Sequence, residues 1–347
     1  MSPASGTLDL DPAVRETLVR AVLRPSWIAV VALTVPFALG LSVPPILQYV
    51  PLAASVLVLG LPHGAVDHLA LPRVRGERPT LRSMNRVFVL YGVLGAAYAA
   101  VWFLAPAVAF VSFILLTWAH WGQGDLYSLL AFTDADYLDG RPMRALAVVV
   151  RGGLPMLVPL LAFPEWYRRV ATALVSLFAP DSVAGLAAVF RPETRLLLGV
   201  AYAAVLIAYL ALAVVRTDDR PAWAVDAGEV LLLVAFFALV PPLLAVGVYF
   251  CLWHSARHVA RLLTVEPGSA SALARGRLRP GVVQFARDAT PLTIGALALL
   301  AGFALLVPNP PADLLGWLGL YLVLIAALTL PHVVVVTVMD REQSVLS

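Results

Sequence analysis

Residues 87–133 carry the pattern that decides the fold: VFVLYGVLGAAYAAVWFLAPAVAFVSFILLTWAHWGQGDLYSLLAFT. Asp125 is the only Asp, Glu, Lys or Arg in this stretch. Because a bilayer crossing needs about 20 apolar residues, the stretch is long enough for two transmembrane helices. Residues 27–72 repeat the pattern, with Asp67 as their only residue of these four types. The sequence therefore predicts an all-α fold, a polytopic transmembrane helical bundle.

The composition of the chain also indicates a membrane protein. Of the 347 residues, 61% are hydrophobic and 13% are charged, and the mean hydropathy is +0.88. The formal charge of +3 comes without a basic tail or a long run of like charges, which argues against a nucleic-acid partner. Cys251 is the only cysteine, so an intrachain disulfide and a cysteine-ligated cluster are excluded. A metal ion here would need nitrogen or oxygen ligands.

We expect about ten membrane spans, or eight if neighbouring spans merge at the prolines that mark kinks or boundaries. The expected spans are residues 27–44, 46–71, 87–105, 107–132, 143–164, 194–215, 223–242, 243–264, 289–307 and 314–338. Residues 165–193 mix charges with short apolar pieces, which is typical of a helix lying at the membrane interface.

This pattern divides the chain into three parts. Residues 1–26 form a polar amino-terminal segment, residues 27–339 a single transmembrane domain, and residues 340–347 a short tail. The first segment lacks the apolar core and small-residue cleavage site of a signal peptide, so we expect it to be retained.

Arginine predicts the orientation in the membrane. Two loops are rich in arginine: Arg73, Arg75, Arg78, Arg82 and Arg86 in one, and Arg261, Arg275, Arg277, Arg279 and Arg287 in the other. With ten spans, both loops and the basic amino-terminal segment lie on one side, which the positive-inside rule assigns to the cytoplasm. We expect a multi-pass protein of the cell (plasma) membrane with both termini cytoplasmic.

The histidines are the candidate functional residues. All six lie inside or at the edge of apolar stretches: His63, His68, His120, His254, His258 and His332. They fall on the second, fourth, eighth and tenth expected spans, at similar depths near the cytoplasmic ends. An imidazole in hydrocarbon needs a partner or a cavity, so this group indicates a functional site, and a metal site first.

Spacing selects the ligands. His254 and His258 are four positions apart on one expected helix, so their rings share a face and could bind one ion. His63 and His120 could complete a set of four imidazoles. The competing interpretation for each is a helix-packing histidine satisfied by hydroxyls or carbonyls. His68 adjoins the basic loop, which favours an interfacial or structural role.

Other residues are predicted around this set. Asp67, four positions after His63, and Asp125, five after His120, are candidates for the outer shell, because metal-bound imidazoles commonly donate their other N–H to a carboxylate. His332 is either a ligand, a pocket wall or a packing contact. The candidate pocket for a flat apolar substrate comprises Trp118, Trp121, Tyr249, Trp253 and His332.

Four segments carry a resemblance to a known family. They are residues 60–68 (GLPHGAVDH), 119–125 (AHWGQGD), 249–258 (YFCLWHSARH) and 329–332 (TLPH). In this order they resemble the Brp/Blh family of membrane β-carotene 15,15'-dioxygenases, over roughly residues 55–340. Residues 151–155 (RGGLP) are also similar to a family segment.

The resemblance implies central oxidative cleavage of β-carotene to two molecules of retinal. It implies Fe(2+) held by histidines, with dioxygen as co-substrate, and the matching ligands are His63, His120, His254 and His258. Residues 27–339 would then be the catalytic domain, in contact with membrane lipid, and an opsin would receive the retinal as a functional partner.

Four other classes were weighed. A di-iron desaturase needs more histidines, in boxes with adjacent pairs. A bis-histidine haem protein would show a Soret band. A proton-coupled transporter would use Asp67, Asp125 and the histidines as a relay and show inverted-repeat hydropathy, which we do not find. A non-catalytic carotenoid- or retinal-binding protein that assists opsin maturation stays open, because retained ligands do not prove turnover.

Overall fold

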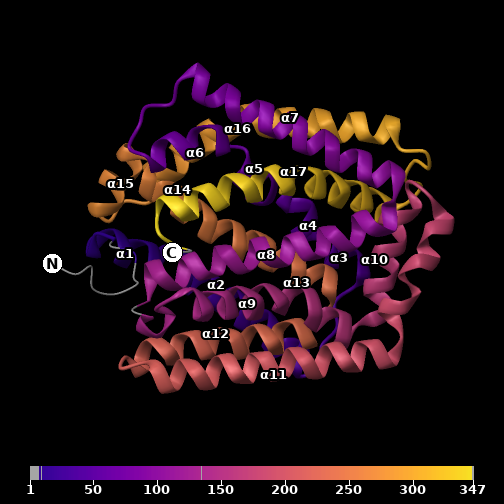
Figure 1. Ribbon diagram of the computed structural model, residues 1–347, viewed down its shortest axis with the longest axis horizontal. Coiled ribbons are helices and arrows are strands. Elements are labelled where there is room, and N and C mark those ends of the chain that lie inside the picture. Colours follow the sequence, from indigo (N-terminus) through magenta and orange to yellow (C-terminus); the bar gives the residue numbers. More distant parts are fainter. Residues whose placement is uncertain (1–7, 9, 134, 346–347) are drawn as a thin grey trace.

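The computed structural model describes residues 8, 10–133 and 135–345 and is almost entirely helical, with no strand among those residues (Figure 1). The first elements are α1 (Pro12–Leu18), η1 (Val19–Leu23), α2 (Arg24–Ala38), α3 (Pro45–Gln48), α4 (Val50–Ser55), α5 (Gly60–Gly64), α6 (Asp67–Val74), α7 (Leu81–Leu104), α8 (Pro106–Phe132), η2 (Asp136–Leu138) and α9 (Arg141–Ala162). They are followed by α10 (Pro164–Ser176), η3 (Pro180–Phe190), α11 (Pro192–Arg216), α12 (Arg220–Leu239), α13 (Pro242–Val248), η4 (Tyr249–Ser255), α14 (Ala256–Val265), α15 (Pro267–Ala274), α16 (Arg279–Leu306) and α17 (Leu314–Glu342).

Eight helical segments are long and apolar enough to cross a membrane: Pro12–Ala38, Pro45–Val74, Leu81–Leu104, Arg141–Ala162, Pro192–Arg216, Arg220–Leu239, Arg279–Leu306 and Leu314–Glu342. Two further segments, α8 and the run from α13 through η4 to α14, have comparable lengths but are more polar, and they carry His120, His254 and His258. The predicted all-α polytopic bundle is confirmed, and the eight segments fall within the expected range.

The long helices run in one common direction, from left to right in Figure 1, and short elements close the two ends. At one end lies α10, which packs against α17 and α8. At the other end lie α1 and the last turns of α17. The first described helix and the end of the last one are therefore on the same side of the bundle.

Two expected boundaries have a more detailed outcome. The helix that begins at Pro12 continues through η1 into α2, across the proposed boundary at residue 27. Residues 1–7 and 9 of the proposed amino-terminal segment, and 346–347 of the proposed tail, lie outside the described residues. The division into three parts stays a prediction.

Close packing of α8 on α9 depends on glycine. A Cβ atom at Gly122 would collide with the Val148 carbonyl, and one at Gly152 with the Trp118 carbonyl. Small residues let two membrane helices approach until their backbones touch, which gains van der Waals contact where no hydrophobic driving force separates protein from lipid. This contact fixes the position of His120 on α8.

A buried network of charges joins α8, α9 and α12. The Arg151 side chain is fully buried, and its guanidinium donates to Asp125 at 3.1 Å, to Asp226 at 2.7 Å and to Glu229 at 2.8 Å. Glu229 also binds Arg257 at 2.6 Å. Charges at membrane depth are costly unless paired, so this network is a strong constraint on how these helices pack.

We expect Arg151→Leu to destabilise the fold severely, by about 3–5 kcal/mol, because it leaves buried carboxylates without a partner. The measurement is the midpoint of thermal unfolding in detergent, together with the yield of monodisperse protein. The control is Arg20→Leu, since the Arg20 side chain is 59% exposed and pairs only with Glu16 at the surface. Equal midpoints for the two variants would contradict the assignment.

Candidate metal centre

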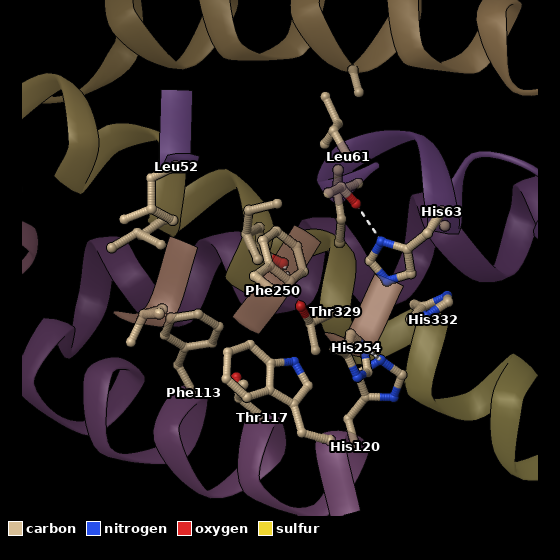
Figure 2. Close-up of a pocket in the computed structure, with 18 of the residues that line it drawn as sticks. Leu52, Leu61, His63, Phe113, Thr117, His120, Phe250, His254, Thr329 and His332 are labelled. Carbon is tan, nitrogen blue, oxygen red and sulfur yellow. Dashed lines mark hydrogen bonds between the residues drawn. The ribbon is translucent and has the colours of Figure 1, made fainter. Parts of the chain in front are cut away.

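Five of the six histidines come together inside the bundle. They are His63 on α5, His120 on α8, His254 on η4, His258 on α14 and His332 on α17. The His63 ring lies in the middle, with centroid distances of 5.5 Å to His254, 5.4 Å to His258 and 5.0 Å to His332. Figure 2 shows four of these rings converging at one end of a pocket.

His68 lies apart from this cluster of five rings. Its ring stacks on Phe88 at a centroid distance of 5.4 Å. The sequence placed His68 at the basic loop as an interfacial or structural residue, and in the structure it lines the outer part of the cavity described below.

The short helix α5 sets the orientation of His63. Its segment is broken on both sides, at residues 56–59 and at 65–66, so α5 is a single isolated turn. Gly60 permits this turn, because a Cβ atom there would lie 2.6 Å from the Phe250 ring. Nδ1 of His63 contacts the Gly60 carbonyl and lies 3.3 Å from the Ser255 hydroxyl. A carbonyl oxygen only accepts, so Nδ1 carries the proton and the lone pair is on Nε2.

His254 lies in a π-helical segment, η4, between two α-helical ones. Such widened turns are rare in helices and occur often at functional sites. His258 follows in the first turn of α14. The sequence prediction that both residues contribute to one site is supported by their rings, which both pack edge-on against His63.

Nitrogen positions fit a metal ion. Nε2 of His254 lies 3.1 Å from Nε2 of His120. His63, His120 and His332 each have a ligand nitrogen within 4.8 Å of the other two. Two nitrogens that bind one ion at about 2.1 Å are about 3–3.4 Å apart at right-angled or tetrahedral geometry. The cluster therefore has the spacing of a nitrogen-ligated metal site.

Several ring nitrogens in the cluster are buried and, within the described residues, have no hydrogen-bond partner. They are Nδ1 of His120, Nδ1 of His254, Nε2 of His258 and Nε2 of His332. Burying a polar atom without a partner costs free energy, so natural proteins rarely leave several together. Binding of a cation by the available lone pairs would offset part of this cost.

Asp67 holds His332 rather than His63. Its Oδ2 atom accepts a hydrogen bond from Nδ1 of His332 at 2.7 Å and another from the Tyr91 hydroxyl at 2.5 Å. Sequence spacing suggested His63 as the partner of Asp67, because the two residues are four positions apart. A carboxylate that binds one ring nitrogen fixes the tautomer and turns the other nitrogen toward a metal. His332 thus becomes a candidate ligand as well as a pocket wall.

Asp125 belongs to the buried charge network. It accepts hydrogen bonds from Arg151 and from Nε1 of Trp253, both at 3.1 Å. Trp253 is followed directly by His254 in η4, and the Arg257 guanidinium stacks on the Trp253 ring at 3.8 Å. Asp125 therefore supports the site through the backbone that carries His254.

A cavity of about 410 Å³ extends from the histidines. Its walls are mostly apolar and come from helices α5 to α10, α13, η4, α16 and α17. Of the predicted pocket residues, Trp121 and His332 line it. Tyr249 packs behind Trp121 at 5.0 Å, next to Trp253.

The other aromatic walls were not predicted from sequence. Trp118 of the predicted set lies against α9 and α11, where Nε1 donates to the Val149 carbonyl and the ring packs on Tyr202. Phe113 and Phe250 line the cavity instead, as Figure 2 shows. Helical spacing from His120 was the available signal for Phe113, since seven residues are two turns on the same face.

The cavity opens beside helix α16. Leu292 and Leu299 line it and are also exposed at the surface, by 36% and 52%. Gly295 lies between them on the same face and is exposed as well. On an apolar membrane helix, exposed leucines face lipid, so the opening leads to the hydrocarbon region.

Comparison with known proteins identifies the family. The family model described as "Beta-carotene 15,15'-dioxygenase" matches residues 54–340. The chain belongs to this family. It is 52% identical over 337 residues to the probable beta-carotene 15,15'-dioxygenase Blh of Halobacterium salinarum, covering 97% of each chain. It is 33% identical over 350 residues to the probable enzyme Brp of the same species, covering 97% of this chain and 96% of the relative.

A further similarity is short. The beta-carotene 15,15'-dioxygenase of an uncultured marine bacterium, 66A03, is 28% identical over 72 residues, which is 21% of this chain and 26% of that relative. No solved structure matches the chain. The region that matches the dioxygenase family begins in α4 and ends in α17, so it contains all five histidines of the cluster.

We expect Asp67→Asn to weaken metal binding by about 10- to 100-fold, because Asp67 orients His332. The measurement is the metal content per mole of purified protein after dialysis against a series of chelator concentrations. His68→Ala is the matched control, since it removes a neighbouring imidazole outside the cluster. Metal retention that falls for His68→Ala and not for Asp67→Asn would contradict this role.

Proposed function

We propose that this protein cleaves β-carotene at its central 15,15' double bond to give two molecules of all-trans-retinal. One observation carries the proposal: five buried histidines, with the spacing of a metal site, form one end of a largely apolar cavity that opens toward lipid. Its relatives named as β-carotene dioxygenases, at 52% and 33% identity over nearly the whole chain, support the same reaction.

The proposed metal is Fe(2+), with His63, His120, His254 and His258 as ligands. His332, whose Nε2 atom has no partner among the described residues, is an additional candidate. Neutral imidazoles suit iron as well as zinc or copper, so the donor set fits the ion. When bound, the iron would supply the redox chemistry that dioxygen needs to react with an electron-rich double bond.

The side chains around the site account for the rest of the reaction. Apolar walls exclude water and hold a polyene by van der Waals contact, and Trp121 presents a flat face next to His254 at 5.5 Å. The reaction breaks one carbon–carbon double bond and forms two carbon–oxygen double bonds, with one atom of dioxygen in each aldehyde. It needs no covalent nucleophile and no net proton transfer from the protein.

The location of the site fits its proposed substrate. A C40 hydrocarbon partitions into the bilayer, and the opening beside Leu292, Gly295 and Leu299 faces that phase. We place the protein in the plasma membrane, surrounded by lipid. An opsin in the same membrane would receive the retinal, as a functional partner without an implied contact.

The decisive experiment compares retinoids in β-carotene-producing cells that express the chain or its His254→Ala form. We expect retinal to appear with loss of β-carotene only in cells with the unmutated chain, because His254 is in the centre of the donor set. Liquid chromatography measures both compounds, and labelled dioxygen should place one labelled atom in each retinal.

Two other outcomes would change the proposal. Bound carotenoid without retinal, in protein that retains its iron, would favour a carotenoid-binding protein. A Soret band on the purified protein would indicate haem in place of non-haem iron.

The proposed orientation has its own test. We expect reporters fused to both termini to be active only in the cytoplasm, because the arginine-rich loops at Arg73–Arg86 and Arg275–Arg287 lie on that side. A cysteine introduced at Gly76, in the first loop, should resist an impermeant thiol reagent in intact cells and react after lysis. A cysteine introduced at Gly40, beyond the opposite end of α2, is the control that should react in intact cells.

A further inference from the structure

The cavity has a long arm that leads from the histidines to helix α10. Three helices line it along their length, and each carries a histidine at the same end. On α8 the lining runs from Phe110 to His120, and on α17 it runs from Leu322 to His332. Ten residues of α-helix advance about 15 Å, so the arm is about 15 Å long on both walls.

Aromatic side chains of α10 close the far end of this arm. Tyr167 packs on Phe110 at a ring distance of 6.4 Å, and Trp166 packs against a small cluster that includes Leu318 and Tyr321 of α17. Val170, one turn further along α10, lines the same end. The end of the arm is therefore built from one face of one helix.

The length of the arm matches half of the proposed substrate. From the central double bond to the ring, β-carotene has about ten bonds, and an extended chain advances about 1.2 Å per bond, as an extended polypeptide does. The chain half is thus about 12 Å long before the ring, which fills the remainder. The central bond lies at the histidines when the ring reaches α10.

We propose that Trp166 and Val170 determine the cleavage position by setting the depth of this arm. The inference rests on the proposed function and adds its positional specificity. Because the two halves of β-carotene are identical, one arm of fixed length is enough to select the central bond. The other half lies toward Val87 and Phe88, where the cavity wall is looser and Phe88 is 41% exposed.

The test is the product pattern of Trp166→Ala in β-carotene-producing cells. A deeper arm lets the polyene slide toward α10, so a bond next to the central one meets the histidines. We expect carbonyl products of unequal length, one longer and one shorter than retinal, with their carbons adding up to forty. Their share relative to retinal should rise about tenfold or more, since a pocket discriminates a missing methylene by at least this factor. Dioxygen again supplies one atom to each carbonyl.

A second variant tests the cause. Val170→Phe added to Trp166→Ala refills the arm, so the double variant should shift the products back toward retinal. Trp317→Ala is the matched control, because Trp317 is a half-exposed tryptophan of α17 outside the cavity wall. Metal content and monodispersity of each purified variant show that the site is intact.

The outcomes separate the two proposals. Retinal from the unmutated chain and only retinal from Trp166→Ala, at any rate, would overturn the role of the arm and leave the proposed function in place. Unequal products from Trp166→Ala that persist in the double variant would also overturn it. No carbonyl product from the unmutated chain would overturn the proposed function and, with it, this inference.

Discussion

The buried Arg151 guanidinium is the interaction on which the rest of the structure depends. It lies where no water is available to solvate it, so the carboxylates that surround it must come from neighbouring helices. Asp125 supplies one from α8, and Asp226 and Glu229 supply two from α12. The Tyr137 and Tyr209 hydroxyls donate to Asp226, which extends the network. Any change in the packing of α8, α9 and α12 would separate charges that cannot be separated cheaply.

The same network reaches the metal centre. Asp125 accepts from Trp253, and Arg257 connects Glu229 to the Trp253 ring. His254 is the next residue after Trp253, within the π-helical turn. The orientation of this histidine is therefore coupled to the pairing of Arg151. The helix interface that orders the fold also orders part of the site.

Sequence reasoning predicted what depends on local periodicity. Hydropathy gave the helical bundle, and depth along the spans with the four-residue spacing of His254 and His258 selected four histidines that the structure brings together. The ligand set itself stays a proposal. His63 and His120 were chosen without knowing which helices are neighbours, because the arginine-rich loops aligned the spans in depth.

Contacts between distant helices were beyond such reasoning. Asp67 and His332 are 265 positions apart, and nothing in either segment indicates the hydrogen bond between them. The partners Asp226 and Glu229 were missed for the same reason, since hydropathy does not say which face of α12 meets Arg151. The π-helical turn at Tyr249–Ser255 was also missed, because it depends on tertiary packing rather than on a sequence signal.

Proton accounting explains why the cluster calls for a cation. His63 donates from Nδ1 to a carbonyl and His332 donates from Nδ1 to a carboxylate, so each has its lone pair on Nε2. At most one proton lies between His120 and His254, whose Nε2 atoms are 3.1 Å apart. Protonating more of the rings would place like charges within a buried space a few ångströms wide, which is costly. A metal ion accepts several lone pairs at once, so its binding free energy adds to the stability of the fold. The histidines and the apolar arm therefore form one site, which joins a cation to a hydrocarbon wall.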